Sequence, residues 1–283
     1  MHVCGWCGSG RTRPYVAAEH LGELYPPSYN AFALPANPVP RAAATALFRW
    51  RYWRGLRRPP LGELSSLTPG RLLDVGSGRG DLGLVLGERG WRVTGVEPSR
   101  EACAEANARG APTLHGTLAT VSSRLDGDFN AVLFQHSLEH VAEPLEDLRL
   151  ARERLLPGGL LLISLPNFGS WQARRFGSDW FHLDLPRHRS HFTMHGITLL
   201  LGRAGLEPLR TTTSTSADGL PMSIQYRCFG ERRYRSGFPL YATVAVTLAT
   251  SPLTALADRA AGAGDILHAV ACRPLGSPRP ART

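Results

Sequence analysis

The chain has 283 residues, of which 43% are hydrophobic and 19% charged, so it can bury the core of one large domain and is not disordered throughout. All 32 basic residues are arginine, and the abundance of Ala, Gly and Pro beside them indicates a GC-rich coding bias. The formal charge of +9 is therefore weak evidence for a nucleic-acid or anionic membrane partner, and we expect no nucleic-acid partner.

The N-terminal region contains little that predicts regular structure. Residues 1–40 are rich in proline, which predicts an irregular segment. Cys4 and Cys7 form a single C-x-x-C knuckle, whereas a structural zinc needs four ligands, so we predict no bound metal. The five scattered cysteines do not form a disulfide framework, and no apolar run follows a basic start. We therefore expect a cytoplasmic protein.

Strands and helices alternate along the rest of the chain, after a helix expected over 41–57. The predicted strands are 71–75, 91–96, 112–115, 130–135, 160–165, 206–213 and 265–272. The predicted helices are 81–89, 99–108, 144–156 and 197–204, with a turn at Pro157-Gly158-Gly159. This alternation predicts a doubly wound, Rossmann-like α/β fold with ligands at the carboxyl ends of its strands.

Two further segments each allow two interpretations. Residues 238–257 are uncharged and long enough for a membrane span, but a single crossing would place the flanking strands of one sheet on opposite sides of the bilayer. We predict a buried helix or lid there, with peripheral membrane contact as the alternative. Residues 48–58 interleave aromatic side chains with arginines, which is typical of nucleic-acid or membrane contacts and equally of a helix that packs its aromatics on the domain and keeps the arginines in water.

The glycine loop after the first predicted strand, LLDVGSGRGDLG over 72–83, fits two cofactors. Gly78, Gly80 and Gly83 match the G-x-G-x-x-G fingerprint of a dinucleotide site. The run from Asp74 to Gly80 equally suits S-adenosylmethionine. Both cofactors need an acid at the end of the second strand to accept hydrogen bonds from ribose hydroxyls, and Glu97 stands there. The loop alone leaves the cofactor open.

Several motifs in a fixed order separate the two interpretations. They are Asp74-Val-Gly76-Ser-Gly78-Arg-Gly80, Gly95-Val-Glu97-Pro98, Ser137-Leu-Glu139-His140, Leu156-Pro157-Gly158-Gly159, and the stretch from Trp180 through Arg187-His188 to Thr193. With these motifs the chain resembles the class I S-adenosylmethionine-dependent methyltransferases over about residues 25–273. The resemblance is to a bacterial branch with one catalytic domain, here with a residual zinc-ribbon-like N-terminus.

This resemblance implies a seven-stranded, mostly parallel sheet whose last strand is antiparallel. It implies a methyltransferase domain over 41–274, with an insertion or lid at 215–264 that shapes acceptor specificity and a disordered tail at 275–283. It also implies S-adenosylmethionine as cofactor. The residues implied to contact it are Asp74 at the methionine end, Gly76, Ser77, Gly78 and Gly80 in the loop, Glu97 and Pro98 at the ribose, Thr117 and Leu118 at the adenine, and Gln135 and His136 beside the methionine and the methyl group.

A histidine-rich stretch follows the fifth predicted strand, where the substrate side of such a site should lie. A neutral histidine is the natural base at physiological pH, and His188 is the first candidate, followed by His182 and His191. Arg187 could bind an acidic substrate group or order the loop. The alternative is that these residues only fix the loop, as Glu139-His140 could do. The spacing matches no standard metal-ligand pattern.

The function that these patterns favour is methyl transfer to a small-molecule or lipid-like acceptor, at oxygen before nitrogen or carbon, by in-line displacement. One alternative is a nicotinamide-dependent oxidoreductase, which is disfavoured because a chain without lysine has no tyrosine-lysine pair. The other is a domain that binds a cofactor or partner without turnover.

Overall fold

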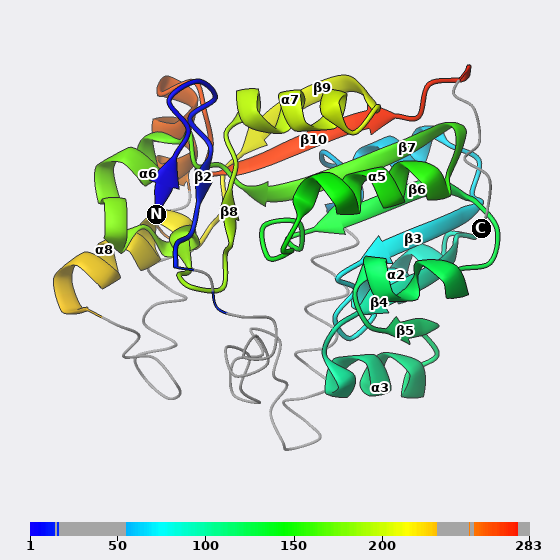
Figure 1. The fold of residues 1–283 in the computed structure, drawn as a ribbon. Coiled ribbons are helices and arrows are strands. Elements are labelled where there is room, and N and C mark those ends of the chain that lie inside the picture. The colour runs from blue at the N-terminus through cyan, green and yellow to red at the C-terminus, as the bar shows by residue number, and fades with distance from the viewer. Residues whose placement is uncertain (15, 17–54, 231–248, 250–251, 277–283) are drawn as a thin grey trace.

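The computed structural model describes residues 1–14, 16, 55–230, 249 and 252–276, and all structural statements below concern these residues. Their centre is a seven-stranded sheet in the order β5-β4-β3-β6-β7-β10-β9 (Figure 1). The strands are β3 Arg71–Val75, β4 Arg92–Glu97, β5 Thr113–His115, β6 Phe129–Gln135, β7 Leu155–Pro166, β9 Glu207–Ser214 and β10 Ile266–Cys272. Neighbours from β5 to β7 are parallel, and β10 runs antiparallel to both β7 and β9. The predicted Rossmann-like sheet with an antiparallel last strand is confirmed.

Helices cover the sheet and its carboxyl-end edge. They are α2 Asp81–Gly87, α3 Arg100–Ala108, α4 Leu118–Val121, α5 Pro144–Arg154, α6 Trp171–Phe176, α7 Met194–Arg203 and α8 Gly219–Phe229, with a further helical stretch over 252–260. The side chain of Thr193 accepts a hydrogen bond from the N–H of Gly196, which explains why α7 begins before the predicted residue 197. No helix in the described ranges has the length and apolar character needed to cross a bilayer. Residues 41–54 and most of 238–251 lie outside them.

The central strands are buried on both faces because their sequences are almost continuously apolar. Along β7, Leu161 and Ile163 pack into one core layer and Leu162 into the other, and all three are fully buried. The structure corrects one prediction here. Pro157-Gly158-Gly159 lies inside β7, because Leu155 already pairs with Phe129 of β6 and the N–H of Gly158 donates to the carbonyl of Arg273.

A second, three-stranded sheet was not predicted. Strands β1 (His2–Val3) and β2 (Gly10–Arg11) form a hairpin, and β2 pairs with β8 (Ser190–His191). The turn of the hairpin is closed by two backbone hydrogen bonds. The N–H of Cys4 donates to the carbonyl of Ser9, and the N–H of Gly8 donates to the carbonyl of Cys4. The expectation of an irregular segment is therefore wrong for residues 2–11. Figure 1 shows this small sheet with α6 and α8 at the side where the parallel strands end.

Thr12 joins the hairpin to the histidine-rich stretch through two buried hydrogen bonds. Its hydroxyl donates to the carbonyl of His188 over 2.6 Å and accepts from Nε2 of His191 over 2.9 Å. Thr12→Val keeps the shape and leaves both partners unsatisfied. We therefore expect the free energy of unfolding, measured with urea, to fall by about 2 kcal/mol or more. Thr68→Val, at an exposed position, should change it by less than about 0.5 kcal/mol. Equal effects of the two substitutions would refute this role of Thr12.

Candidate active site

The loop between β3 and α2 needs glycine for two different reasons. Gly76 and Gly80 have φ of +80° and +74°, and a Cβ would lie 2.4 Å from Ser137 Cβ in the first case and 2.4 Å from Ala111 Cβ in the second. Gly78 has φ of +55°, but a Cβ there would meet nothing within 4 Å. The backbone at Gly78 therefore borders open space, into which a ligand can approach.

Glu97 ends β4 with its carboxylate fixed beside this loop. Its oxygens accept the backbone N–H groups of Gly78 and Ser99, both over 2.8 Å. Burial raises the pKa of Glu97, and the two N–H groups oppose that effect. The result is an oriented acceptor at the carboxyl edge of the sheet, suited to hydroxyl donors.

Asp74 supplies a buried carboxyl group in β3, directly before the loop. Its side chain is 2% exposed, and burial together with the charge of Glu97 raises its pKa to about 7. Two acids close together at this edge would be stabilised by a ligand cation, which would bring the pKa of Asp74 back down. This pair of acceptor groups fits a ligand that carries both an ammonium group and sugar hydroxyls.

Other residues predicted at the cofactor lie differently. The side chain of Leu118 is 1% exposed and belongs to the main core, and Thr117 caps α4. The adenine contact at Thr117 and Leu118 stays a prediction. Ser77 points under the loop, where a Cβ on Gly95 would lie 2.5 Å from its hydroxyl. Pro98 is exposed, and its carbonyl lies 3.1 Å from Nε2 of His115.

The end of β6 carries two polar side chains beside this edge. The side-chain carbonyl of Gln135 is buried with no hydrogen-bond partner in the described part of the chain. His136 has φ of +53°, which is unusual for a residue with a Cβ. Its backbone N–H donates to the backbone carbonyl of Ser164 over 2.8 Å. Its side chain remains 41% exposed. Strained backbone of this kind is found preferentially at functional sites.

Glu139 lies three residues beyond His136 and is only 2% exposed. One of its carboxylate oxygens lies 3.6 Å from Nδ1 of His136 and 4.0 Å from Nε2 of His188. Burial raises the pKa of Glu139, but His136, His140 and His188 together outweigh burial and lower it to about 2. Glu139 is therefore an anion at neutral pH. The sequence showed this residue only as one half of a Glu-His pair.

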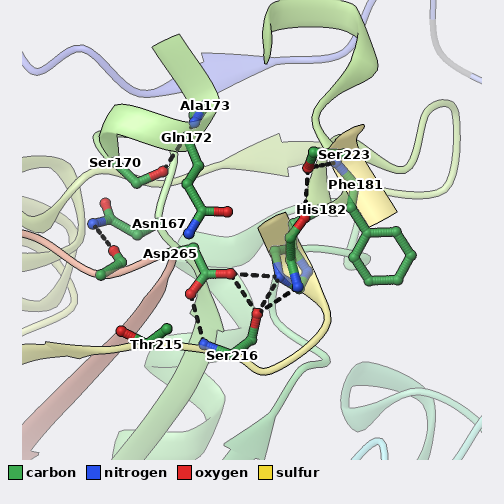
Figure 2. Close-up of polar contacts among 12 residues, drawn as sticks. Asn167, Ser170, Gln172, Ala173, Phe181, His182, Thr215, Ser216, Ser223 and Asp265 are labelled. Atoms are coloured by element: carbon green, nitrogen blue, oxygen red, sulfur yellow. Dashed lines mark hydrogen bonds and ion pairs between the residues drawn. The ribbon is translucent and has the colours of Figure 1, made fainter. Parts of the chain in front are cut away.

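Hydrogen bonds fix His182 in the loop that contains it, as Figure 2 shows. Its Nε2 lies 3.0 Å from a carboxylate oxygen of Asp265 and 3.1 Å from the hydroxyl of Ser216. The other oxygen of Asp265 accepts the N–H of Ser216 over 2.7 Å. Burial lowers the pKa of His182, but Asp265 more than offsets this effect and raises it. This geometry supports the loop-fixing interpretation of His182.

The three remaining predicted catalytic side chains also hold the loop. His188 is 8% exposed, its Nδ1 lies 2.9 Å from the carbonyl of His182, and burial together with His140 lowers its pKa to about 3. His191 contacts Thr12, and burial lowers its pKa to about 4. Arg187 binds Asp184 through two parallel hydrogen bonds. Their catalytic roles stay predictions.

The raised pKa of Asp74 makes the stability of the ligand-free protein depend on pH. Between pH 3.8 and about 7 the folded state keeps this proton and the unfolded state has lost it. The free energy of unfolding therefore falls as pH rises through that window. At pH 8 the free energy of unfolding of Asp74→Asn, measured with urea, should therefore exceed that of the wild type by up to about 4 kcal/mol. This difference should disappear near pH 4. The exposed control Asp126→Asn should show no such trend. A gap that stays constant with pH would contradict this account.

Comparisons with known proteins agree with this geometry. The family described as Methyltransferase domain matches residues 46–211. The chain is 30% identical over 186 residues to the ubiquinone biosynthesis O-methyltransferase of Dinoroseobacter shibae, spanning 61% of this chain and 72% of that protein. Its counterpart in Cereibacter sphaeroides is 31% identical over 150 residues, spanning 49% of this chain and 61% of that protein. A solved S-adenosylmethionine-dependent methyltransferase of Thermotoga maritima shares the fold, with a TM-score of 0.53 and 17% identity over 90% of this chain and all of that one. The chain belongs to the methyltransferase-domain family and is an S-adenosylmethionine-dependent methyltransferase.

Proposed function

We propose that this enzyme transfers the methyl group of S-adenosylmethionine to an oxygen atom of a small-molecule or lipid-like acceptor. The observation that carries the proposal is the exposed imidazole of His136 at the end of β6, on the same edge of the sheet as Asp74 and Glu97. The relatives named as O-methyltransferases support oxygen as the acceptor atom. Membership of the family also decides against a nicotinamide cofactor.

The cofactor would lie across the carboxyl ends of β3 and β4. Asp74 would face its ammonium group, because this buried carboxyl lacks a compensating cation among the described residues. Glu97 would accept hydrogen bonds from the ribose hydroxyls. The open space at Gly78 would admit the part of the cofactor that lies between its ammonium group and its ribose. The buried side-chain carbonyl of Gln135 supplies a further acceptor near the methionine end.

Proton removal from the acceptor hydroxyl would fall to His136 rather than to His188. With a pKa near 3, His188 is a weak base, whereas an effective base has a pKa near the working pH. The carboxylate of Glu139, 3.6 Å from Nδ1 of His136, would hold the proton on that nitrogen and leave Nε2 free to accept one. It would also stabilise the imidazolium that forms. The sulfonium of the cofactor would supply the methyl group. The remaining requirement is that the acceptor oxygen is aligned with the methyl group and the sulfur.

The helices beside the site favour an acceptor with an apolar part. Ile224 and Phe229 of α8 are 48% and 59% exposed, and Leu253 and Leu256 in the stretch 252–260 are 68% and 63% exposed. Asp258, in the same stretch 252–260, accepts from the indole N–H of Trp171 in α6 over 2.6 Å. Exposed apolar side chains on these helices suit a lipid-like substrate.

Binding of the cofactor can be measured apart from catalysis. Glu97→Gln keeps the size of the side chain but removes the charge that accepts the ribose hydroxyls. We expect its affinity for S-adenosylhomocysteine in calorimetric titration to fall about 10- to 100-fold. Glu101→Gln, an exposed position four residues further on, should bind like the wild type. If Glu97→Gln also binds normally, the placement of the ribose is wrong.

The acceptor assignment is tested by incubating the enzyme with S-adenosylmethionine and matched panels of phenols, aliphatic alcohols and amines, each with short and long alkyl chains. Mass spectrometry of the products should show methylation at oxygen, with long-chain acceptors preferred. His136→Gln should lower kcat about 100-fold or more and change the pH profile, while cofactor binding persists. The exposed His195→Gln is the matched control. Products methylated only at nitrogen would refute the proposal.

A further inference from the structure

The turn of the N-terminal hairpin (Figure 1) holds two free cysteines, Cys4 and Cys7, that the methyl transfer does not use. The N–H of Gly8 donates to the carbonyl of Cys4 over 2.9 Å, and Gly8 has φ of +70°, so the chain reverses directly after Cys7. This reversal brings the two side chains together, and the thiol of Cys7 donates to the sulfur of Cys4. No other two of the five cysteines stand so close in the sequence.

The pair is anchored on the domain and open on its outer side. Thr193, which caps α7, donates its hydroxyl to the carbonyl of Cys7 over 2.6 Å and its N–H to the hydroxyl of Ser9 over 3.2 Å. Cys4 is exposed and Cys7 is half-buried. A Cβ on Gly5, between them, would meet nothing within 4 Å. The turn is therefore held in place while small molecules can reach its thiols.

The surroundings of Cys4 favour the thiolate, which is the reactive form of a cysteine. Hydrogen bonds from the backbone N–H groups of Cys7 and Trp6, and then from the thiol of Cys7, lower the pKa of Cys4. Burial has the opposite effect at Cys103 and Cys272, where it raises the pKa of the thiol. Cys4 is therefore suited to attack, and Cys7 lies beside it as the second thiol.

A hollow of about 410 Å³ adjoins Cys4 on the same hairpin. It is lined by His2, Val3, Cys4, Ser9, Arg11 and Arg13, which include two arginines and no acid. Arg11 also donates to the carbonyl of Ala142 over 3.0 Å and pairs with Glu143 at 3.4 Å, but the side chain of Glu143 is 68% exposed, so water screens this pair. The hollow therefore suits a small molecule that carries carboxylates.

We propose that Cys4 and Cys7 form a reversible disulfide by exchange with small anionic disulfides, which bind in the arginine-lined hollow. The thiolate of Cys4 attacks one sulfur of the small disulfide, so a mixed disulfide forms and one small thiolate leaves. Cys7 then loses its proton and attacks Sγ of Cys4, and the second small thiolate leaves. The two cysteines are oxidised, the small disulfide is reduced to two thiols, and these take up the two protons. The reaction needs neither cofactor nor acceptor, so it does not depend on the proposed function.

The test is to incubate the reduced full-length protein near pH 7 with oxidised glutathione, which is anionic, and separately with hydroxyethyl disulfide, which is neutral. Samples are alkylated at intervals and their peptides analysed by mass spectrometry. We expect the disulfide between Cys4 and Cys7 to form about 10-fold or more faster than Cys228, an exposed cysteine elsewhere, is modified. Equal modification of Cys4 and Cys228, without this disulfide, would overturn the proposal.

The binding hollow is tested by its charge. Arg13→Gln should slow the reaction with oxidised glutathione about 3-fold or more, and high salt should slow it in the wild type. Hydroxyethyl disulfide should react equally with both proteins, because it has no carboxylate. If Arg13→Gln slows neither disulfide, or slows both equally, the small disulfide does not bind in this hollow.

Cysteine variants separate the two steps of the exchange. Cys7→Ser should stop at the mixed disulfide and keep one glutathione on Cys4, whereas Cys4→Ser should lose the fast reaction. The control Cys228→Ser should still form the disulfide within the turn. A fast reaction that persists in Cys4→Ser would overturn the assignment. Stoichiometric zinc that is held by the two thiols and blocks their oxidation would overturn it as well.

Discussion

The arrangement of the site depends on two hydrogen bonds to one backbone carbonyl. The carbonyl of Glu139 accepts the N–H groups of Arg189 and Ser190, over 2.8 and 3.1 Å. These bonds join the turn after β6 to the segment that enters β8. Because the turn continues from the cofactor edge and the segment carries His188, these bonds help to set the distance between the two. Nδ1 of His140, 3.3 Å from the carbonyl of Arg187, adds a further contact between the same segments.

Buried acids fix the surrounding segments in a similar way. Asp265, at the start of β10, holds both His182 and Ser216, and Asp258 accepts from Trp171, Gln172 and Thr215. Each carboxylate therefore ties elements on one side of the sheet edge to a loop on the other. Such networks stabilise a single arrangement of loops, because an unpaired buried acid costs more free energy than an unmade surface contact. These segments are thus held in place by polar contacts together with a small apolar cluster of Ala173, Phe176, Trp180 and Leu183.

The sequence predicted the sheet well and the loops poorly, for physical reasons. Strands β3, β6 and β10 are short apolar runs between turn residues, and their bounds differ from the prediction by one residue at most. The two-residue strands β1, β2 and β8 have no periodic pattern to detect, and the pairing of β2 with β8 joins Gly10 to His191 and Arg11 to Ser190, which are far apart in the sequence. Helix α8 was missed because Pro221 and a mixed composition hide its periodicity.

The same division holds within the site. The glycine loop and Glu97 could be predicted because neighbouring parallel strands bring their carboxyl ends together, so spacing along the chain becomes proximity in space. The meeting of Glu139 with His188 could not, because it depends on how two long loops close on each other.

The N-terminal hairpin has a consequence for the order in which the protein is made. Thr12 and His191 are separated by 179 residues, and β2 finds its partner strand only after β8 has been synthesised. At about 5–20 residues per second, the first strands leave the ribosome roughly 10–35 s before β8 does. During that time their edge and the Cys4 and Cys7 thiols are exposed to chaperones and oxidants. The pairing of β2 with β8 therefore has to wait for the synthesis of β8, and the contacts of Asp258 and Asp265 with the same region form later still.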